Sequence, residues 1–272
     1  MVSVNTNYGA MVALQNLNST QSELSTVQDR LNTGLKVASA RDNGAVFAIA
    51  QDMRVRVSAQ GILRDAMDRV SATIDNALSA AGGVQNILTQ MRDKALAASA
   101  PGLSAVQIAA YNNDFVALRD SIDPLVNAAQ LNGQNLINDS AASLSVKVND
   151  LSLGTVITIT GQGLTTASLS INTLTFATAG EASTAVSTIA GVISSINGSL
   201  ASLGAKSKAI EQFRTFNAKL SDTLEKGIGE LVDADLPRES ANLQALQVKQ
   251  QLGAQALSIA NQSPQIILSL FR

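Results

Sequence analysis

The chain has 272 residues, and its 19 basic and 21 acidic side chains give a formal net charge of −2. Apolar residues make up 46% of it, but aromatic residues only 3%, and tryptophan is absent. Small aliphatic side chains of this kind favour long, closely packed helices over a core built around rings. The balanced charge, without a long run of either sign, excludes the basic footprint of a nucleic-acid-binding protein.

Composition also restricts catalytic and metal chemistry. Histidine and cysteine are absent, which removes disulfides, thiolate or imidazole metal ligands and the commonest general base. The carboxylates Glu230, Asp233 and Asp235 could bind a hard cation through oxygen. Because they lie just before Pro237, we interpret Asp233 or Asp235 as a helix cap instead. We therefore expect no catalytic residue, no cofactor, no metal site and no enzymatic activity.

Two features bear on the compartment of the protein. Residues 1–9 carry no Lys or Arg and no continuous apolar run, so the sequence predicts either a cytoplasmic protein or export without a cleaved secretory signal. Residues 151–180 and 182–205 are uncharged and long enough to raise the question of a membrane span. Both stretches are rich in Ser, Thr, Asn and Gly, and this polarity argues against a spanning helix.

The first predicted element is a helix near the N-terminus whose seam is partly polar. The leucines that keep the heptad spacing are Leu14, Leu17, Leu24, Leu31 and Leu35, and the seam positions between them include Gln21 and Gln28. Polar seam residues weaken a helix pair and help to fix its register. The pattern predicts a helix that is marginal by itself.

The second predicted helix has the clearest heptad pattern in the chain. Apolar residues alternate in steps of three and four for four heptads, as in the seam of a coiled coil. The seam consists of Met67, Val70, Ile74, Ala77, Ala81, Val84, Leu88, Met91 and Ala95. At 1.5 Å per residue such a helix is roughly 43 Å long, which suits a helical bundle.

The next predicted helix runs antiparallel to the helix that contains residues 67–95. Pro101-Gly102 ends the preceding helix, and Ser104 and Gln107 form a capping-box pattern at the start of the next. Apolar residues then keep the helical spacing until Asn132-Gly133. A short turn between two such segments predicts a helical hairpin.

Residues 139–180 have a different pattern. Apolar and polar residues alternate from Leu144 to Val148, residues 156–160 are rich in β-branched side chains, and glycines such as Gly154 punctuate the segment. These features predict short β-hairpins. Helical spacing resumes at Val186 and runs on to Leu224, which predicts a third long helix.

The C-terminal end repeats the character of the N-terminal one. Leu243, Leu246 and Leu257 keep a heptad spacing that Gln250 and Gly253 interrupt. The two ends could form one more hairpin on the bundle, or they could order only against other copies of the chain. The predicted fold class is mainly α: a long antiparallel helical bundle or coiled-coil rod, with a small β-hairpin region and a terminal helix pair.

Three separated motifs stand out in the terminal parts of the chain. The first is Ser3-Val4-Asn5-Thr6-Asn7 with the apolar residues that follow it, and the second is the segment GLKVASARDN at residues 34–43. The third is ALSIANQSPQ at residues 256–265, followed by Leu268, Leu270 and Phe271-Arg272. These motifs resemble those of bacterial flagellin, and the resemblance covers about the first 135 and the last 90 residues. The short middle is similar to the minimal, Caulobacter-like flagellins of alphaproteobacteria.

The resemblance implies a secreted structural subunit that polymerises into the extracellular flagellar filament for swimming motility. It implies export by the flagellar type III system, with the terminal helices pairing to form the filament core. The implied partners are other copies of the chain and other flagellins, the flagellar cap and hook-associated proteins, and an export chaperone. Neither nucleic acid nor membrane insertion is expected.

The resemblance also implies a domain division. Residues 1–40 would hold the N-terminal D0 helix and linker, and residues 236–272 the C-terminal D0 helix. The D1 rod would consist of long helices in residues 41–138, a β-hairpin region in 139–180 and a long helix in 181–235. The implied D0 polymerisation residues are Leu14, Leu17, Gln21, Leu24, Leu31, Leu243, Leu246, Gln250, Leu257, Ile267, Leu268, Leu270 and Phe271. The implied D1 rod seam is Met67, Val70, Ile74, Val84, Leu88 and Met91.

Two other functions are compatible with parts of the sequence. A hook-filament junction protein has similar end helices, and a secreted membrane-inserting translocator would account for the uncharged stretches. Some flagellins are also sensed by an animal receptor through an arginine and a leucine of the rod helix. Gln90 and Lys94 stand at those positions here, so the sequence departs from that pattern.

Overall fold

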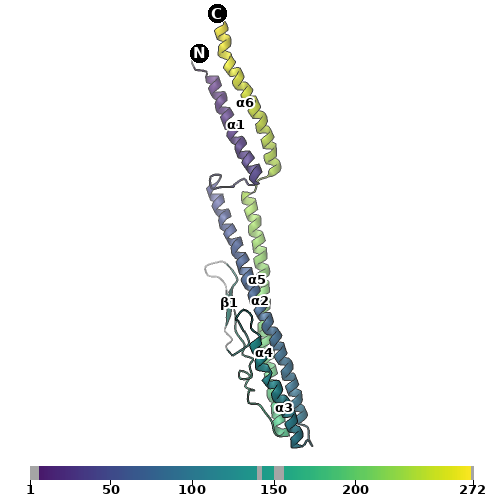
Figure 1. The fold of residues 1–272 in the computed structure, drawn as a ribbon. Coiled ribbons are helices and arrows are strands. Elements are labelled where there is room, and N and C mark those ends of the chain that lie inside the picture. The colour runs from purple at the N-terminus through teal and green to yellow at the C-terminus, as the bar shows by residue number, and fades with distance from the viewer. Residues whose placement is uncertain (1–5, 140–142, 150–155, 271–272) are drawn as a thin grey trace. The chain divides into compact units, whose positions relative to one another are not determined.

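A computed structural model describes residues 6–139, 143–149 and 156–270, with side chains described up to residue 262 (Figure 1). The chain forms two compact units, one from Met1–Val55 and Asp222–Arg272 and the other from Arg56–Ser221. The elements in chain order are α1 (Tyr8–Thr33), α2 (Gly44–Ala98), α3 (Ala105–Asp120), α4 (Ile122–Ala128), β1 (Leu144–Lys147), β2 (Val156–Ile159), α5 (Ala179–Val232) and α6 (Leu236–Leu270). The predicted mainly α fold with a small β-hairpin is confirmed.

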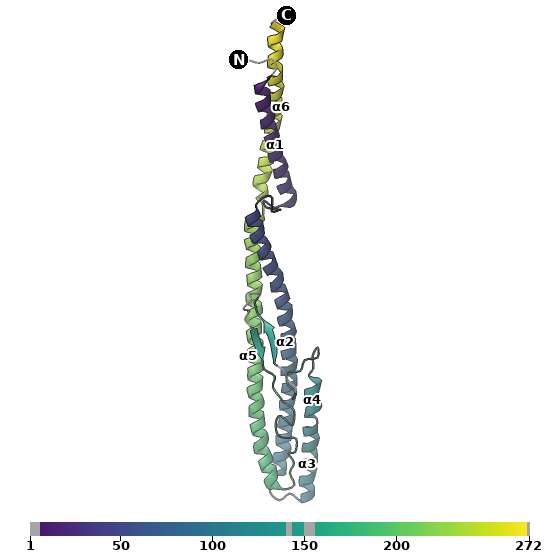
Figure 2. The same ribbon diagram turned by 90° about the vertical axis from the view of Figure 1, so that its left-hand side faces the viewer.

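In the first unit, α1 and α6 lie side by side (Figures 1 and 2). Helix α1 begins after Asn7, whose Oδ1 accepts a hydrogen bond of 3.0 Å from the Ala10 amide, and it ends at Gly34 in the left-handed region with φ 72°. Helix α6 begins after Asp235, whose Oδ1 accepts a bond of 3.2 Å from the Arg238 amide. Asp235 is therefore a cap, as the sequence predicts.

In the second unit, the seam of α2 lies in the larger apolar core. Every one of its nine seam residues is at most 8% exposed. Ile108 and Phe115 of α3 and Ile189 of α5 belong to the same core. Figure 2 shows α3 and α4 running alongside α2. The predicted capping box is present, because Ser104 Oγ accepts from the Gln107 amide and Gln107 Oε1 accepts from the Ser104 amide at 2.9 Å.

The prediction of a single helix between residues 104 and 132 is wrong, because the helix is interrupted at Ser121 and forms the separate helices α3 and α4. Pro124 is the physical reason. It has no amide hydrogen to donate to the carbonyl of Asp120, and its ring would clash with that carbonyl inside a continuous helix. The apolar spacing passes through the break because both helices bury the same kind of face, with Phe115, Ile122 and Val126 all at 0% exposure.

The two strands form an antiparallel hairpin, in which Leu144 pairs with Ile159 and Val146 pairs with Ile157. These side chains face the core, while the Ser145 and Thr158 hydroxyls meet on the outer face at 3.2 Å. Asn217 of α5 donates a hydrogen bond of 3.0 Å to the Val148 carbonyl and so ties the hairpin to the helices. Gly154, which is predicted to punctuate this region, lies outside the described residues.

Candidate functional site

Polar contacts join α1 and its cap to α6 along the length of the pair. In order along α1 they are Asn7 to the Ala260 carbonyl at 2.6 Å, Gln21 to Gln250 at 2.6 Å, Glu23 to Lys249 at 3.5 Å and Arg30 to Glu239 at 3.3 Å. Because the partners run in reverse order along α6, the two helices are antiparallel. Of the three glutamines predicted to interrupt the seams, Gln21 and Gln250 bond to each other while Gln28 is exposed. A polar pair of this kind favours one register over the others.

The leucines of the two terminal helices are only partly covered by the pairing. Leu24 and its neighbour Val27 are buried, whereas Leu14 is 48% exposed. The half-buried ones are Leu17, Leu31, Leu243, Leu246 and Leu257. Gly253 lies against Leu17, since a Cβ added there would stand 3.4 Å from Leu17 Cδ1. The Ile267, Leu268 and Leu270 side chains and the whole of Phe271 lie outside the described part of the chain.

Several apolar side chains of the same helices face solvent, and together we call them the terminal apolar surface. It consists of Tyr8, Met11, Leu14, Val248, Leu252 and Ile259, which are between 48% and 79% exposed. Val248, Leu252 and Ile259 are spaced by four and seven residues and so share one face of α6. A single heptad seam per helix predicts only Leu14 among these residues. A second apolar stripe per helix is the signal that would have found them.

The segment after α1 is held to the end of α5 by backbone hydrogen bonds. The Lys36 amide donates to the Val232 carbonyl at 2.7 Å, and the Ala234 amide donates to the Gly34 carbonyl at 2.9 Å. Lys36 Nζ adds a bond of 2.9 Å to the carbonyl of Glu230, near the C-terminal end of α5, where a cation is favoured. The segment linking the helices is therefore an ordered part of the first unit.

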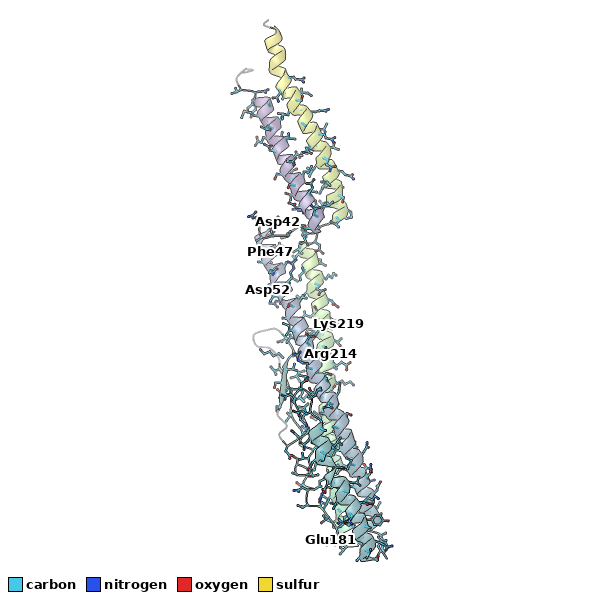
Figure 3. All side chains as sticks on the ribbon, viewed as in Figure 1. Asp42, Phe47, Asp52, Glu181, Arg214 and Lys219 are labelled. Carbon is cyan, nitrogen blue, oxygen red and sulfur yellow. The ribbon has the colours of Figure 1, made fainter. Side chains whose placement is uncertain are left out.

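Asp42, labelled in Figure 3, folds the rest of this segment around its carboxylate. Its Oδ2 accepts hydrogen bonds from the Ser39 amide at 2.8 Å, the Ala38 amide at 3.1 Å and the Ser39 hydroxyl at 3.1 Å. The bonds from the Ser39 amide and hydroxyl are the main reasons that the pKa of Asp42 lies below its ordinary value. The carboxylate stabilises the loop in its ionised form.

In the second unit, charged residues brace the helices from outside the core. Arg214 of α5, which is labelled in Figure 3, pairs with Asp68 of α2 at 2.5 Å. Lys94 of α2 pairs with Asp114 of α3 at 2.7 Å, and this hydrogen bond raises the pKa of Lys94. Gln90 is exposed. The implied rod seam residues, from Met67 to Met91, are buried in the core, so their role in the structure is packing.

The remaining candidates are a metal site and a membrane-spanning helix. In the described ranges, no group of three or more carboxylate, imidazole or thiol side chains is placed to hold a metal ion. One described helix, α5, is long and apolar enough to cross a membrane by length and composition, which alone is weak evidence. Within its uncharged stretch, Ala182, Ile189 and Ile196 belong to the core of the second unit. Long paired helices with an exposed apolar face at the chain ends define a structural, self-associating class of protein.

Comparisons with known proteins agree with this class. The family model for the bacterial flagellin N-terminal helical region matches residues 4–142, and that for the C-terminal helical region matches residues 186–271. The chain is 46% identical to flagellin FljK of Caulobacter vibrioides, over 99% of this chain and 98% of that protein. It is 34% identical to a flagellin of Brucella melitensis over the whole of both chains.

A solved structure shows the same fold. The crystal structure of Bacillus cereus flagellin aligns with a TM-score of 0.51 and 22% identity, and the alignment covers 56% of this chain and 88% of that one. The chain belongs to the bacterial flagellin family. It is a structural subunit of the extracellular flagellar filament and not an enzyme.

Proposed function

We propose that the chain is exported by the flagellar type III system and adds to a filament used for swimming, with its paired terminal helices lining the filament core. The observation that carries this proposal is the terminal apolar surface. The described residues of the first unit leave side chains such as Leu252, at 61% exposed, and Ile259, at 69%, largely uncovered. Apolar faces of this kind are usually covered in an assembly, and in a homopolymer the cover comes from other copies of the chain.

The weak internal cover of the terminal helices supports their export in an unfolded state. Helix α1 buries only Thr20, Leu24 and Val27 over 26 residues. Helices in water depend on the burial of an amphipathic face for most of their stability. A pair with so little burial opens readily, and it gains its missing cover on assembly.

The proposal includes a division of the chain into D0 and D1 parts. Residues 1–40 and 236–272 form the D0 part, and residues 41–138, 139–180 and 181–235 form the D1 rod. The D0 polymerisation residues other than Phe271 lie on α1 and α6, while the rod seam lies in the core of the second unit. The flagellar cap, the hook-associated proteins and an export chaperone complete the proposed set of partners.

Two changes test the filament proposal. Deletion of residues 263–272 is expected to abolish polymerisation while circular dichroism still reports folded rod helices. Leu252→Asp is expected to block elongation of seeded filaments, because it places a charge on the terminal apolar surface. Leu252→Met keeps an apolar side chain of similar volume and should elongate normally. Long filaments from the deletion variant, or from Leu252→Asp at the normal rate, would refute the proposal.

A hook-filament junction protein is the nearest alternative. The full-length likeness to proteins named flagellin favours the filament subunit. Seeded elongation distinguishes the two, because a filament subunit continues to add to its own seeds whereas a junction protein does not.

A further inference from the structure

The chain contains three Asn-Gly pairs, and the structure places them in three different settings. They are Asn43-Gly44 before α2, Asn132-Gly133 after α4 and Asn197-Gly198 inside α5. An Asn side chain can be attacked by the backbone nitrogen of the next residue, and a following glycine leaves that nitrogen unhindered. The reactivity of each pair therefore depends on how firmly the local structure holds the side chain and the nitrogen.

Asn132-Gly133 occupies a tight two-residue turn. The amides and carbonyls of Leu131 and Gln134 exchange hydrogen bonds, both of 2.9 Å, across the turn. Asn132 has φ 51° and Gly133 has φ 79°, and two positive φ values in succession are the signature of a type I′ turn. Both residues are exposed, and a Cβ added at Gly133 would meet nothing within 4 Å.

This turn can rotate its central peptide without losing its flanking bonds. Types I′ and II′ both have a positive φ at the first central residue, and they differ in the sign of φ at the second. Gly133 adopts either sign without a steric penalty, whereas the first central position of a type II′ turn favours glycine and strains Asn132, so the rotated form is a minor state. The rotation changes the direction of the Gly133 nitrogen relative to the Asn132 side chain, while Leu131 and Gln134 stay paired.

The other two pairs are restrained. Asn43 Oδ1 accepts a hydrogen bond of 3.1 Å from the Val46 amide at the start of α2. Asn197 Oδ1 accepts a bond of 2.9 Å from Gln85 Nε2, and Gly198 lies in the middle of α5, where its amide belongs to the helix. Among the described residues, no hydrogen bond is recorded to the Asn132 side chain.

We propose that Asn132 is a site of spontaneous deamidation in the folded protein. The deprotonated Gly133 nitrogen attacks Asn132 Cγ, a C–N bond closes a five-membered succinimide, and the side-chain nitrogen leaves as ammonia. Water then adds to one imide carbonyl and opens the ring to aspartate or isoaspartate. The net reaction exchanges the amide for a carboxylate and ammonium, with no oxidant or reductant.

The product changes the charge of a defined groove. Asn132 lines a cavity of about 270 Å³ together with Arg69 and Val70 of α2 and Leu144 of β1. A carboxylate at position 132 brings a negative charge to a cavity whose lining includes the cationic residue Arg69. Isoaspartate also adds one carbon to the backbone of a two-residue turn, which alters the pairing of Leu131 with Gln134.

Peptide mapping of the full-length chain tests the proposal. After incubation of folded protein in mildly alkaline buffer, Asn132 should convert at least roughly tenfold faster than Asn197, whose reaction requires local opening of α5. In denaturant the three pairs should react at similar rates. Asn132→Gln should remove the early product and its isoaspartyl methyltransferase labelling. Equal rates at Asn132 and Asn197 in the folded chain, or the same preference for Asn132 in denaturant, would overturn the proposal.

Discussion

Gln250 of α6 donates a hydrogen bond of 2.6 Å to Gln21 of α1, so the glutamines that interrupt the two terminal seams face each other. A polar pair in an otherwise apolar seam disfavours shifted registers and lowers the stability of the pair. The terminal helices are thereby specific in register yet weakly held. Both properties fit the proposed function, in which the terminal helices open for export and close in one arrangement on assembly.

Replacing this pair should strengthen the terminal helices. The double variant Gln21→Leu/Gln250→Leu exchanges a polar contact for an apolar one and should raise the opening free energy of α1 and α6 by about 1 kcal/mol. Hydrogen exchange of the α1 amides measures this as slower exchange. Gln28→Leu is the matched control, because Gln28 is exposed like Gln21 but makes no hydrogen bond to α6 among the described residues, so exchange should stay unchanged. Unaltered or faster exchange in the double variant would contradict the assigned contact.

The seam of α2 should dominate the stability of the second unit. Leu88 is 0% exposed and Leu96, two turns further along the same helix, is 57% exposed. Leu88→Ala should destabilise the unit by about 2–5 kcal/mol through lost burial and a residual cavity. Leu96→Ala should stay within about 0.5 kcal/mol of the parent. Urea unfolding followed by circular dichroism compares them, and similar losses in both variants would count against the seam.

Two adjacent glycines of α2 should respond differently to the same substitution. A Cβ at Gly83 would lie 2.9 Å from Leu125 Cδ2 of α4, whereas one at Gly82 meets nothing within 4 Å. Gly82→Ala should stabilise the helix by about 0.5–1 kcal/mol. Gly83→Ala should gain less, because the Leu125 side chain has to shift. Thermal unfolding gives both values, and an equal gain would show that α4 packs differently.

The loop at residues 38–42 should open in acid. The hydrogen bonds from Ser39 lower the pKa of Asp42 below its ordinary value of 3.8. The ionised carboxylate therefore stabilises the loop fully at pH values above 3.8, and this stabilisation is lost as the pH falls through the lowered pKa. NMR titration of the Asp42 carboxyl, with exchange of the Ser39 amide, measures the transition. Asp42→Asn should lose protection of that amide at neutral pH as well. A midpoint at or above 3.8 would contradict the loop geometry.

The sequence predicts the parts of the fold that follow a regular periodicity. It does not predict a local helix break or a contact between residues far apart in the chain. The spacing from Met67 to Ala95 predicts a buried seam because one periodicity serves a helix that packs on one face. The break at Ser121 escapes the same method, since Pro124 falls between seam positions and the apolar spacing continues past it. The bond from Lys36 to the Glu230 carbonyl joins residues far apart in the chain, and no local pattern indicates such a contact.

The sequence likewise indicates some residues of the candidate site but not others. The glutamines at 21 and 250 stand out in the sequence as interruptions, but only the structure shows that they bond to each other. The exposed residues Val248, Leu252 and Ile259 were missed because a single seam per helix was expected. Their exposure depends on how much of α6 one neighbouring helix can cover, which is a property of the pair.

A helical reconstruction of the assembled filament tests the account most directly. The account predicts that α1 and α6 lie at the filament axis, with Leu14, Val248, Leu252 and Ile259 buried against neighbouring copies of the chain. A filament in which these side chains remain in contact with solvent, or in which the terminal helices lie outside the core, would contradict it.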